Sequence, residues 1–328
     1  MRKSARFLLT LLVPSLLSVH CLIAASLTGT TGGQVLEVSP DARAAAMGGA
    51  YCAVSDDAGC LYYNPAGLGG IDHIEIPLTN NQLFQGMTQQ HAGIIYSLRD
   101  VRSSNVLGMG TIAGDISFFD AGSMVKRDAA GASLGSFTHK AVLATAAYGR
   151  RLYEAENSWQ VFGGVSARML SEESDNEKAN NMSFDAGTLV TTPLKTLSFG
   201  FTVQNIGGKM NYVSEKNDLP LNIKTGTALR LFDNSFLIAM DLNRPFYGKN
   251  WMAFGTEYIV QETLAFRVGY STLSDQGSGL STGIGLKISN LDFDFMYARE
   301  LDIDYAFVPS GELGNLHRIT LVFKLGAD

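Results

Sequence analysis

Long runs in which apolar residues alternate with small or polar ones constrain this chain more than any other feature. The alternation recurs from Ile74 to the C-terminus. A clear example places apolar Leu264, Phe266, Val268 and Tyr270 between Ala265, Arg267 and Gly269. A period of two puts the two sets on opposite faces of an extended strand. Many runs approach the roughly 9–11 residues that an outer-membrane strand needs, whereas soluble strands average about 5–6.

The two faces of these predicted strands differ in chemistry. One carries Leu, Ile, Phe and Tyr, and the other is rich in Gly, Ser, Thr and full charges, as expected of a barrel with lipid outside and a polar lumen. The whole chain is 46% apolar and only 17% charged, below the roughly 25% charge of typical soluble domains. A soluble β-sandwich, with water on its polar face, is the alternative that the alternation leaves open.

The pattern predicts an all-β fold, a transmembrane antiparallel β-barrel of about fourteen strands over residues 74–328. We expect the strands at residues 74–82, 90–98, 105–118, 138–151, 158–171, 183–192, 196–205, 220–232, 235–243, 251–260, 263–271, 279–288, 291–299 and 316–326. Connections after even-numbered strands are short, as at Asp233-Asn234 and Ser289-Asn290, and most of the others are long, at 119–137, 172–182, 206–219 and 300–315. Tight periplasmic turns and long outer loops produce this difference, so both ends of the barrel are expected in the periplasm.

The first 25 residues have the pattern of a cleaved signal peptide. Positive Arg2, Lys3 and Arg6 precede an apolar stretch, and small residues follow at Ala24-Ala25. No later apolar run is long enough for a helical span. The chain is therefore expected to be exported to the outer membrane of a diderm bacterium, with outer-membrane lipid as its surroundings.

The two cysteines beyond the signal peptide, Cys52 and Cys60, allow two interpretations. Their spacing would permit a disulfide in an oxidising periplasm, or both are buried small apolar residues.

Charge and motifs exclude several functions. The net charge is −6 and the basic residues are dispersed, so nucleic acid is not expected as a partner. Two Gly-x-Ser-x-Gly stretches, at 131–135 and 279–283, do not join a strand to a helix as a nucleophile elbow does. The histidines are scattered over different predicted strands and connections, so their spacing indicates neither a catalytic triad nor a metal site. We therefore predict a protein that is not an enzyme, with no catalytic residue, metal or cofactor.

Residues 26–73 break the alternation and carry a specific resemblance. The run ARAAAMGGAYCAVSDDAGCLYYNPAGL, which ends at Leu68, resembles the N-terminal hatch of FadL-like outer-membrane channels. It is especially similar to the PorV/PorQ branch and to uncharacterised FadL-like proteins of spirochaetes. The resemblance extends to two later stretches, Gln204-Asn205-Ile206-Gly207-Gly208 and Leu219-Pro220-Leu221.

The resemblance implies a barrel plugged by residues 26–73, which takes up long-chain fatty acids or other hydrophobic small molecules passively. The residues that it implies for the hatch and its gating are Asn64, Pro65, Ala66, Gly48, Gly49, Asp56 and Asp57. Pro65 fixes a turn, and Asn64 has a side chain suited to bonding nearby backbone. The alternative function is that of a PorV-like, secretion-associated protein that binds protein partners through extracellular loops.

Cations on the predicted lumenal face are candidates for binding the carboxylate of a fatty-acid-like ligand. They are Lys224, Arg230, Arg267, Lys287 and Arg318. The alternative interpretation is a charge ladder balanced by lumenal acids, with no ligand role. Those acids are Asp241, Glu257, Asp292 and Asp294.

Overall fold

The computed structural model describes residues 31–98, 110–155, 159–175, 177–193, 196–211, 216–273, 278–293 and 296–326. The predicted signal peptide, residues 1–25, lies outside the described residues.

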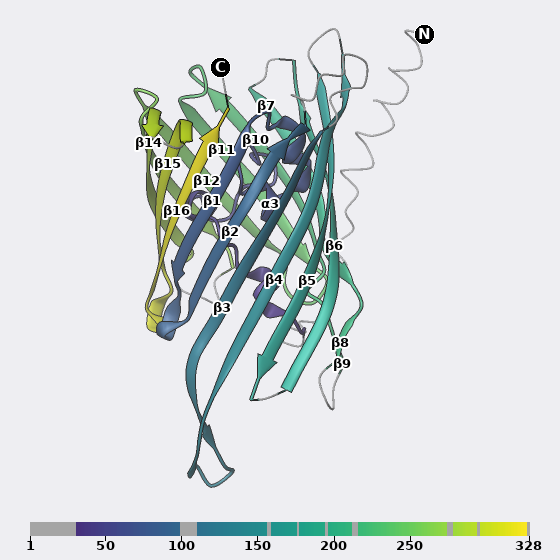
Figure 1. Cartoon of the computed structure of the whole chain (residues 1–328), viewed down its shortest axis with the longest axis vertical. Helices are drawn as coiled ribbons and strands as arrows, with labels where there is room; N and C mark the ends of the chain where they lie inside the picture. The colour runs from purple at the N-terminus through teal and green to yellow at the C-terminus, as the bar shows by residue number, and fades with distance from the viewer. Residues whose placement is uncertain are drawn as a thin grey trace.

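Fourteen antiparallel strands close into a barrel, as the alternation predicts (Figure 1). They are β1 Ile74–Gln82, β2 Thr88–Ser97, β3 Thr111–Arg127, β4 Ser133–Glu154, β5 Gln160–Ser174, β6 Glu177–Thr191, β7 Leu197–Gly207, β10 Asn222–Leu231, β11 Phe236–Pro245, β12 Trp251–Val260, β13 Leu264–Ser271, β14 Leu280–Phe293, β15 Met296–Pro309 and β16 Asn315–Leu325. The seam joins β1 to β16, with Ile74 opposite Leu325. Strands β8 (Lys209–Asn211) and β9 (Lys216–Asp218) form a separate hairpin between β7 and β10.

The outer face of the barrel is apolar. On β13, Phe266, Val268 and Tyr270 are 47%, 50% and 46% exposed, whereas the inward Ala265 and Arg267 are buried. Closure pairs the strand backbones, which is what hydrocarbon surroundings require. A closed barrel with this exterior excludes the soluble sandwich. Within the described part of the chain, no helix has the length and apolar character needed to cross a membrane.

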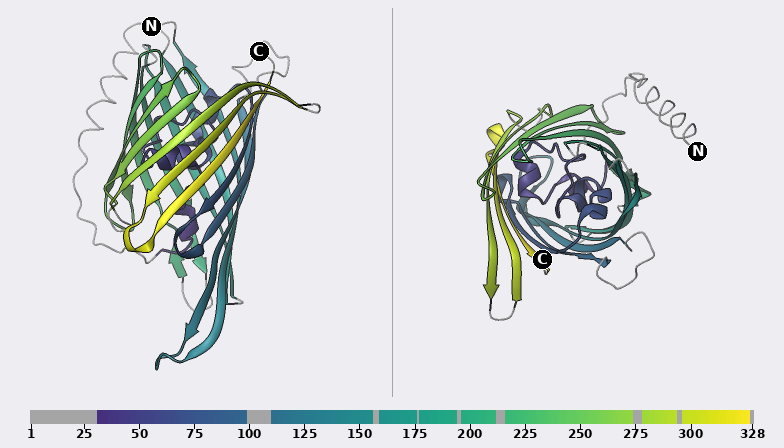
Figure 2. Two further views of the ribbon diagram at one scale, coloured as in Figure 1. Left: turned by 90° about the vertical axis from the view of Figure 1, so that its left-hand side faces the viewer. Right: turned by 90° about the horizontal axis from the view of Figure 1, so that it is seen from above.

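Two predicted boundaries are wrong at the end of the chain. Strand β14 runs through the predicted turn at Ser289-Asn290, and β15 fills most of the predicted loop at 300–315. The alternation continues through both strands, so it contains no signal of where the chain reverses. The paired ends of β14 and β15 extend away from the barrel (Figure 2).

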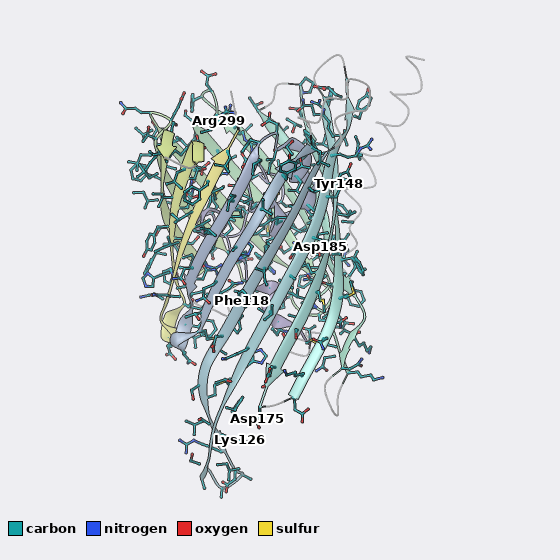
Figure 3. The ribbon with its side chains drawn as sticks, in the orientation of Figure 1. Phe118, Lys126, Tyr148, Asp175, Asp185 and Arg299 are labelled. Atoms are coloured by element: carbon teal, nitrogen blue, oxygen red, sulfur yellow. The ribbon has the colours of Figure 1, made fainter. Side chains whose placement is uncertain are left out.

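The predicted loops at 119–137 and 172–182 are also mostly strand. Strand β3 continues to Arg127, β4 begins at Ser133, and β5 and β6 reach Ser174 and Glu177. The β3–β4 hairpin therefore projects past its neighbours (Figure 1). Lys126 and Asp175 form an ion pair near its end (Figure 3). Because segments that extend far beyond the membrane are typical of the outer side, we assign the end with the projecting β3–β4 hairpin and the β8–β9 hairpin as extracellular and the opposite end as periplasmic.

Residues 31–73, which we call the inner segment, lie inside the barrel (Figure 2). Their elements are η1 (Gln34–Glu37), α2 (Ala42–Ala46), α3 (Cys60–Tyr63) and η2 (Pro65–Gly70). At the extracellular end, the Gly32 amide donates to the carbonyl oxygen of Asp218, the last residue of β9, at 3.0 Å. At the other end the segment continues into β1. The inner segment thus spans the lumen from the extracellular to the periplasmic side.

Rows of glycines in the wall allow the inner segment to pack directly on strand backbone. In register, Gly164 lies opposite Gly149 and Gly187, Gly200 opposite Gly226, and Gly255 opposite Gly269. A Cβ at Gly164 would lie 2.2 Å from Pro65 O, one at Gly200 2.2 Å from Cys52 O, and one at Gly269 2.0 Å from Gly48 N. No larger residue fits these positions while the inner segment stays in place.

Candidate functional site

Among the described residues, two large cavities lie inside the barrel at its opposite ends, and the inner segment lines both. The extracellular cavity, about 360 Å³, is bounded by Tyr62, Tyr63, Lys224 and Trp251 among others. The periplasmic cavity, about 480 Å³, has many charged side chains in its lining. These are Arg43, Asp56, Asp57, Arg230, Glu257, Arg267, Lys287, Asp302 and Lys324. The aromatic cavity and the charged cavity offer different chemistry at the two ends.

Asn64 ties the inner segment together and to the wall. Its fully buried side chain donates from Nδ2 to Cys52 O at 2.9 Å and to Thr188 O of β6 at 3.0 Å. Its Oδ1 accepts from the Ala66 amide, at the start of the η2 helix that Pro65 opens. Asn64, Pro65 and Ala66 therefore meet the wall at one point.

Gly48 makes the second close approach among the predicted hatch residues. It has a left-handed φ of 68°, and a Cβ there would lie 2.7 Å from the Tyr270 amide nitrogen. Gly49 follows with φ 83°. These two glycines let the chain turn against β13 directly after α2.

Arg43 holds the inner segment to the wall at the periplasmic cavity. It donates from Nε and Nη2 to the two carboxylate oxygens of Glu257 on β12, at 2.8 and 2.7 Å. Its Nη1 reaches Asp56 at 2.7 Å and Asp57 at 2.8 Å. Asp56 also pairs with Arg230 of β10 at 2.9 Å. Burial alone would raise the pKa of Asp56, but Arg43 and Arg230 hold it well below its usual value.

The chain was compared with known proteins. No protein-family model and no curated protein matches it. Among solved structures, the Ralstonia pickettii toluene transporter TbuX is 13% identical, with a TM-score of 0.55 over 86% of this chain and 96% of that one. A Pseudomonas aeruginosa FadL homologue is 12% identical, with a TM-score of 0.55 over 88% and 97%. The P. putida toluene transporter TodX is 12% identical, with a TM-score of 0.53 over 87% and 98%.

This chain has the FadL-type outer-membrane barrel fold. The predicted resemblance is confirmed at the level of the fold, and with the apolar outer band it confirms the outer-membrane localisation. The named proteins are transporters rather than enzymes. The finer resemblance to the PorV/PorQ branch stays a prediction.

Within this FadL-type barrel, the predicted lumenal cations fall into two groups. Three have carboxylate partners: Arg230 with Asp56, Arg267 with Glu257 and Asp304, and Lys287 with Glu300 at 3.9 Å. For these, the balanced charge ladder describes the geometry. Of the predicted ladder acids, Asp241 and Glu257 are buried in the lumen, and Asp292 and Asp294 have no described side chains.

The other two cations lack a carboxylate partner. Arg318 donates from Nη1 to Ser39 O of the inner segment. Lys224 is 3% exposed and lies with Nζ 4.6 Å from the centroid of the Tyr63 ring. Among the described residues, no carboxylate oxygen lies within the 4.0 Å of an ion pair with either. Lys224 is the only one of the five that faces the aromatic extracellular cavity.

Cys52 and Cys60 are free and fully buried, so the structure contains no disulfide between them. Burial raises the pKa of both thiols. The Cys52 amide instead donates to Asp241 Oδ2 of β11 at 2.9 Å. Their burial agrees with the interpretation of two small buried residues, and a disulfide in the periplasm stays a prediction.

Sequence reasoning missed two arginines that anchor the inner segment. Arg43 is the only Lys or Arg in residues 31–73, and a lone cation among lumenal carboxylates was a usable signal. Arg168 on β5 pairs with Asp185 of β6 at 2.6 Å and donates to Leu61 O at 3.1 Å. Both side chains are buried, and Asp185 is labelled in Figure 3. The Arg168 contact depends on barrel register, and no sequence signal indicated it.

Proposed function

We propose that this protein is a passive channel that takes up hydrophobic and amphipathic small molecules, long-chain fatty acids included, and that residues 26–73 are its hatch. The supporting observation is a fold shared with proteins named toluene transporters, here with a lumen filled by a segment that lies between two cavities. Burial of each CH₂ contributes about 0.8 kcal/mol, so an apolar ligand binds in an aromatic cavity without covalent chemistry.

Passage requires the inner segment to shift. Its attachments to the wall are non-covalent: Arg43 with Glu257, Asp56 with Arg230, and Asn64 with Thr188 O. Contacts of this kind break and re-form without chemical change. They are the contacts on which we expect gating to depend.

Uptake of a labelled fatty acid into liposomes that contain the purified barrel tests this function. The wild type is compared with the Asn64→Ala/Pro65→Ala variant, which removes the wall contact and the fixed turn. Lys126→Ala, on the projecting β3–β4 hairpin, is the matched control. We expect flux above empty liposomes, raised severalfold in the double variant and unchanged in the control.

The outcomes separate the channel from its gate. Background-level flux from both the wild type and the double variant would contradict the transport proposal. If both show the same flux above background, the channel proposal stands and the gating role of Asn64 and Pro65 is contradicted.

A second proposal is the secretion-associated interaction protein. The observation that favours it is the projecting β3–β4 hairpin, on which Val125 and Leu134 are 57% and 60% exposed. Replacing residues 124–136 with a short turn should then block export of secreted proteins while liposome flux is unchanged. Unaltered export would contradict this role.

A further inference from the structure

The extracellular cavity contains a buried cation whose hydrogen-bond donors are largely unused. Lys224 projects from β10 into this cavity. Asp241 of β11 is a buried acid that attracts this amine, but the two form no ion pair within 4.0 Å. Its Oδ2 accepts from the amides of Tyr51 and Cys52, both at 2.9 Å, and its Oδ1 has no hydrogen-bond partner among the described residues. The amine lies instead against aromatic rings, 4.6 Å from the Tyr63 centroid and 6.0 Å from that of Trp251. A charged amine in this position is stabilised by ring faces and has no carboxylate within ion-pair distance among the described residues.

A second donor lies beside Lys224. Asn243 of β11 is opposite Lys224 in register, and its fully buried side chain leaves Nδ2 without a hydrogen-bond partner among the described residues. A buried donor without a partner costs free energy that an incoming acceptor recovers. The two strands thus place an amine that lines the cavity beside an unpartnered amide NH₂ that lies buried behind it, and both are donors that suit a carboxylate.

The walls of the cavity indicate what the rest of the ligand is. A volume of about 360 Å³, at about 30 Å³ per water molecule, has room for an aromatic ring with a short side chain. Tyr62, Tyr63 and Trp251 give the cavity flat aromatic walls, against which a ring stacks offset or edge-on.

We propose that the extracellular cavity is a binding site for a small aromatic monocarboxylate, with the carboxylate on Lys224 and the ring against the partly buried Trp251. This inference rests on the proposed function, since it takes the cavity to be the entry side of the channel. It narrows the ligand class from hydrophobic molecules in general to compact aromatic acids at this point of the route.

Trp251 provides a direct test in detergent solution, independent of transport. The chain has two tryptophans, so Trp159→Phe leaves Trp251 as the only one. We titrate this protein with 3-phenylpropionate and with its neutral analogue 3-phenylpropanol, and follow Trp251 fluorescence. The acid should bind roughly 10- to 100-fold more tightly than the alcohol, the range expected for a hydrogen bond to a charged group. Equal affinities for the acid and the alcohol would overturn the proposal, and this result does not require a substitution at Lys224.

Substitutions at Lys224 test whether its amine causes the preference for the acid over the alcohol. Lys224→Met should remove the preference for the acid while keeping the binding of the alcohol, which also shows that the cavity has formed. Lys224→Arg should keep most of the preference. Lys287→Met, in the periplasmic cavity, is the matched control and should bind as the parent does. Undiminished acid binding by Lys224→Met would contradict the site.

The binding and flux experiments can fail independently. If the acid binds but flux stays at background level, the channel proposal is contradicted and the binding-site proposal stands. If flux is observed but the acid does not bind, the channel proposal stands and the binding-site proposal is contradicted.

Discussion

Arg43 reaches three carboxylates, two in its own segment and one in the wall, through a side chain that is 14% exposed. Removing one partner of a buried ion pair leaves the other charge uncompensated, which typically costs about 3–5 kcal/mol. The inner segment therefore depends on this guanidinium for its position at β12.

Arg43→Gln should loosen the inner segment without unfolding the barrel. We expect maleimide labelling of the buried Cys52 and Cys60 to accelerate at least about tenfold, corresponding to roughly 1.4 kcal/mol. Heat-modifiable migration should show an intact barrel. Arg151→Gln, which removes an exposed pair with Glu154, is the control and should label at the wild-type rate. Identical rates for the two variants would contradict the anchoring role.

Asp41 makes the packing of the inner segment sensitive to pH. Its side chain caps α2 by accepting from the Ala44 amide. Burial, and then the charge of nearby Asp57, raises its pKa to about 7, against roughly 3.9 when unfolded. The packed state therefore binds more protons than the released state. Its stability falls as the pH rises from about 4 to about 7.

Asp41→Asn should remove this dependence, because Asn caps a helix about as well as Asp and does not ionise. The measurement is the ratio of wild-type to Asp41→Asn thiol-labelling rates, in which the pH dependence of the thiol reaction cancels. We expect the ratio to rise between pH 5 and pH 8. A ratio that is flat, or that falls, would show that packing does not raise the pKa of Asp41.

At the scale of elements, the wall of β4 to β6 is shaped to fit η2. Gly149, Gly164 and Gly187 form one row across these strands. Any side chain there must push η2 inward, and overpacking of this kind typically costs about 1–3 kcal/mol.

Gly164→Ala should therefore displace η2 and accelerate labelling of Cys60. The neighbouring Gly163 gives a matched control on the same strand, because a Cβ there meets only the flexible side chain of Leu152. Gly163→Ala should label like the wild type. Equal labelling of both variants would contradict a role for the row in seating η2.

The elements also show how far sequence reasoning reaches. Period-two alternation predicted the strand number and the lipid-facing residues, since both depend only on local patterning. It failed at Ser289-Asn290, where the pattern runs through two paired strands. The resemblance directed attention to Asn64, Asp56 and Asp57, whereas Arg168 and Asp304 act through strand register, which the alternation does not specify.

At the scale of the whole molecule, charge and aromatic character are divided between the two ends of one lumen. The periplasmic cavity has paired charges that fasten the inner segment. The extracellular cavity has aromatic walls and the unpaired Lys224. Ligand recognition is therefore expected at the extracellular end and restraint of the hatch at the periplasmic end.

The enclosure of residues 31–73 also constrains how the protein is assembled. Their backbone lies against glycines of strands on several sides of the lumen, and the seam between β1 and β16 joins the two ends of the strand sequence. Such a long-range contact closes late, because the loop entropy must be overcome first. The earliest-synthesised part of the barrel domain must then be positioned while the sheet is still open. We therefore expect the wall to fold around the inner segment, which is packed before the seam closes.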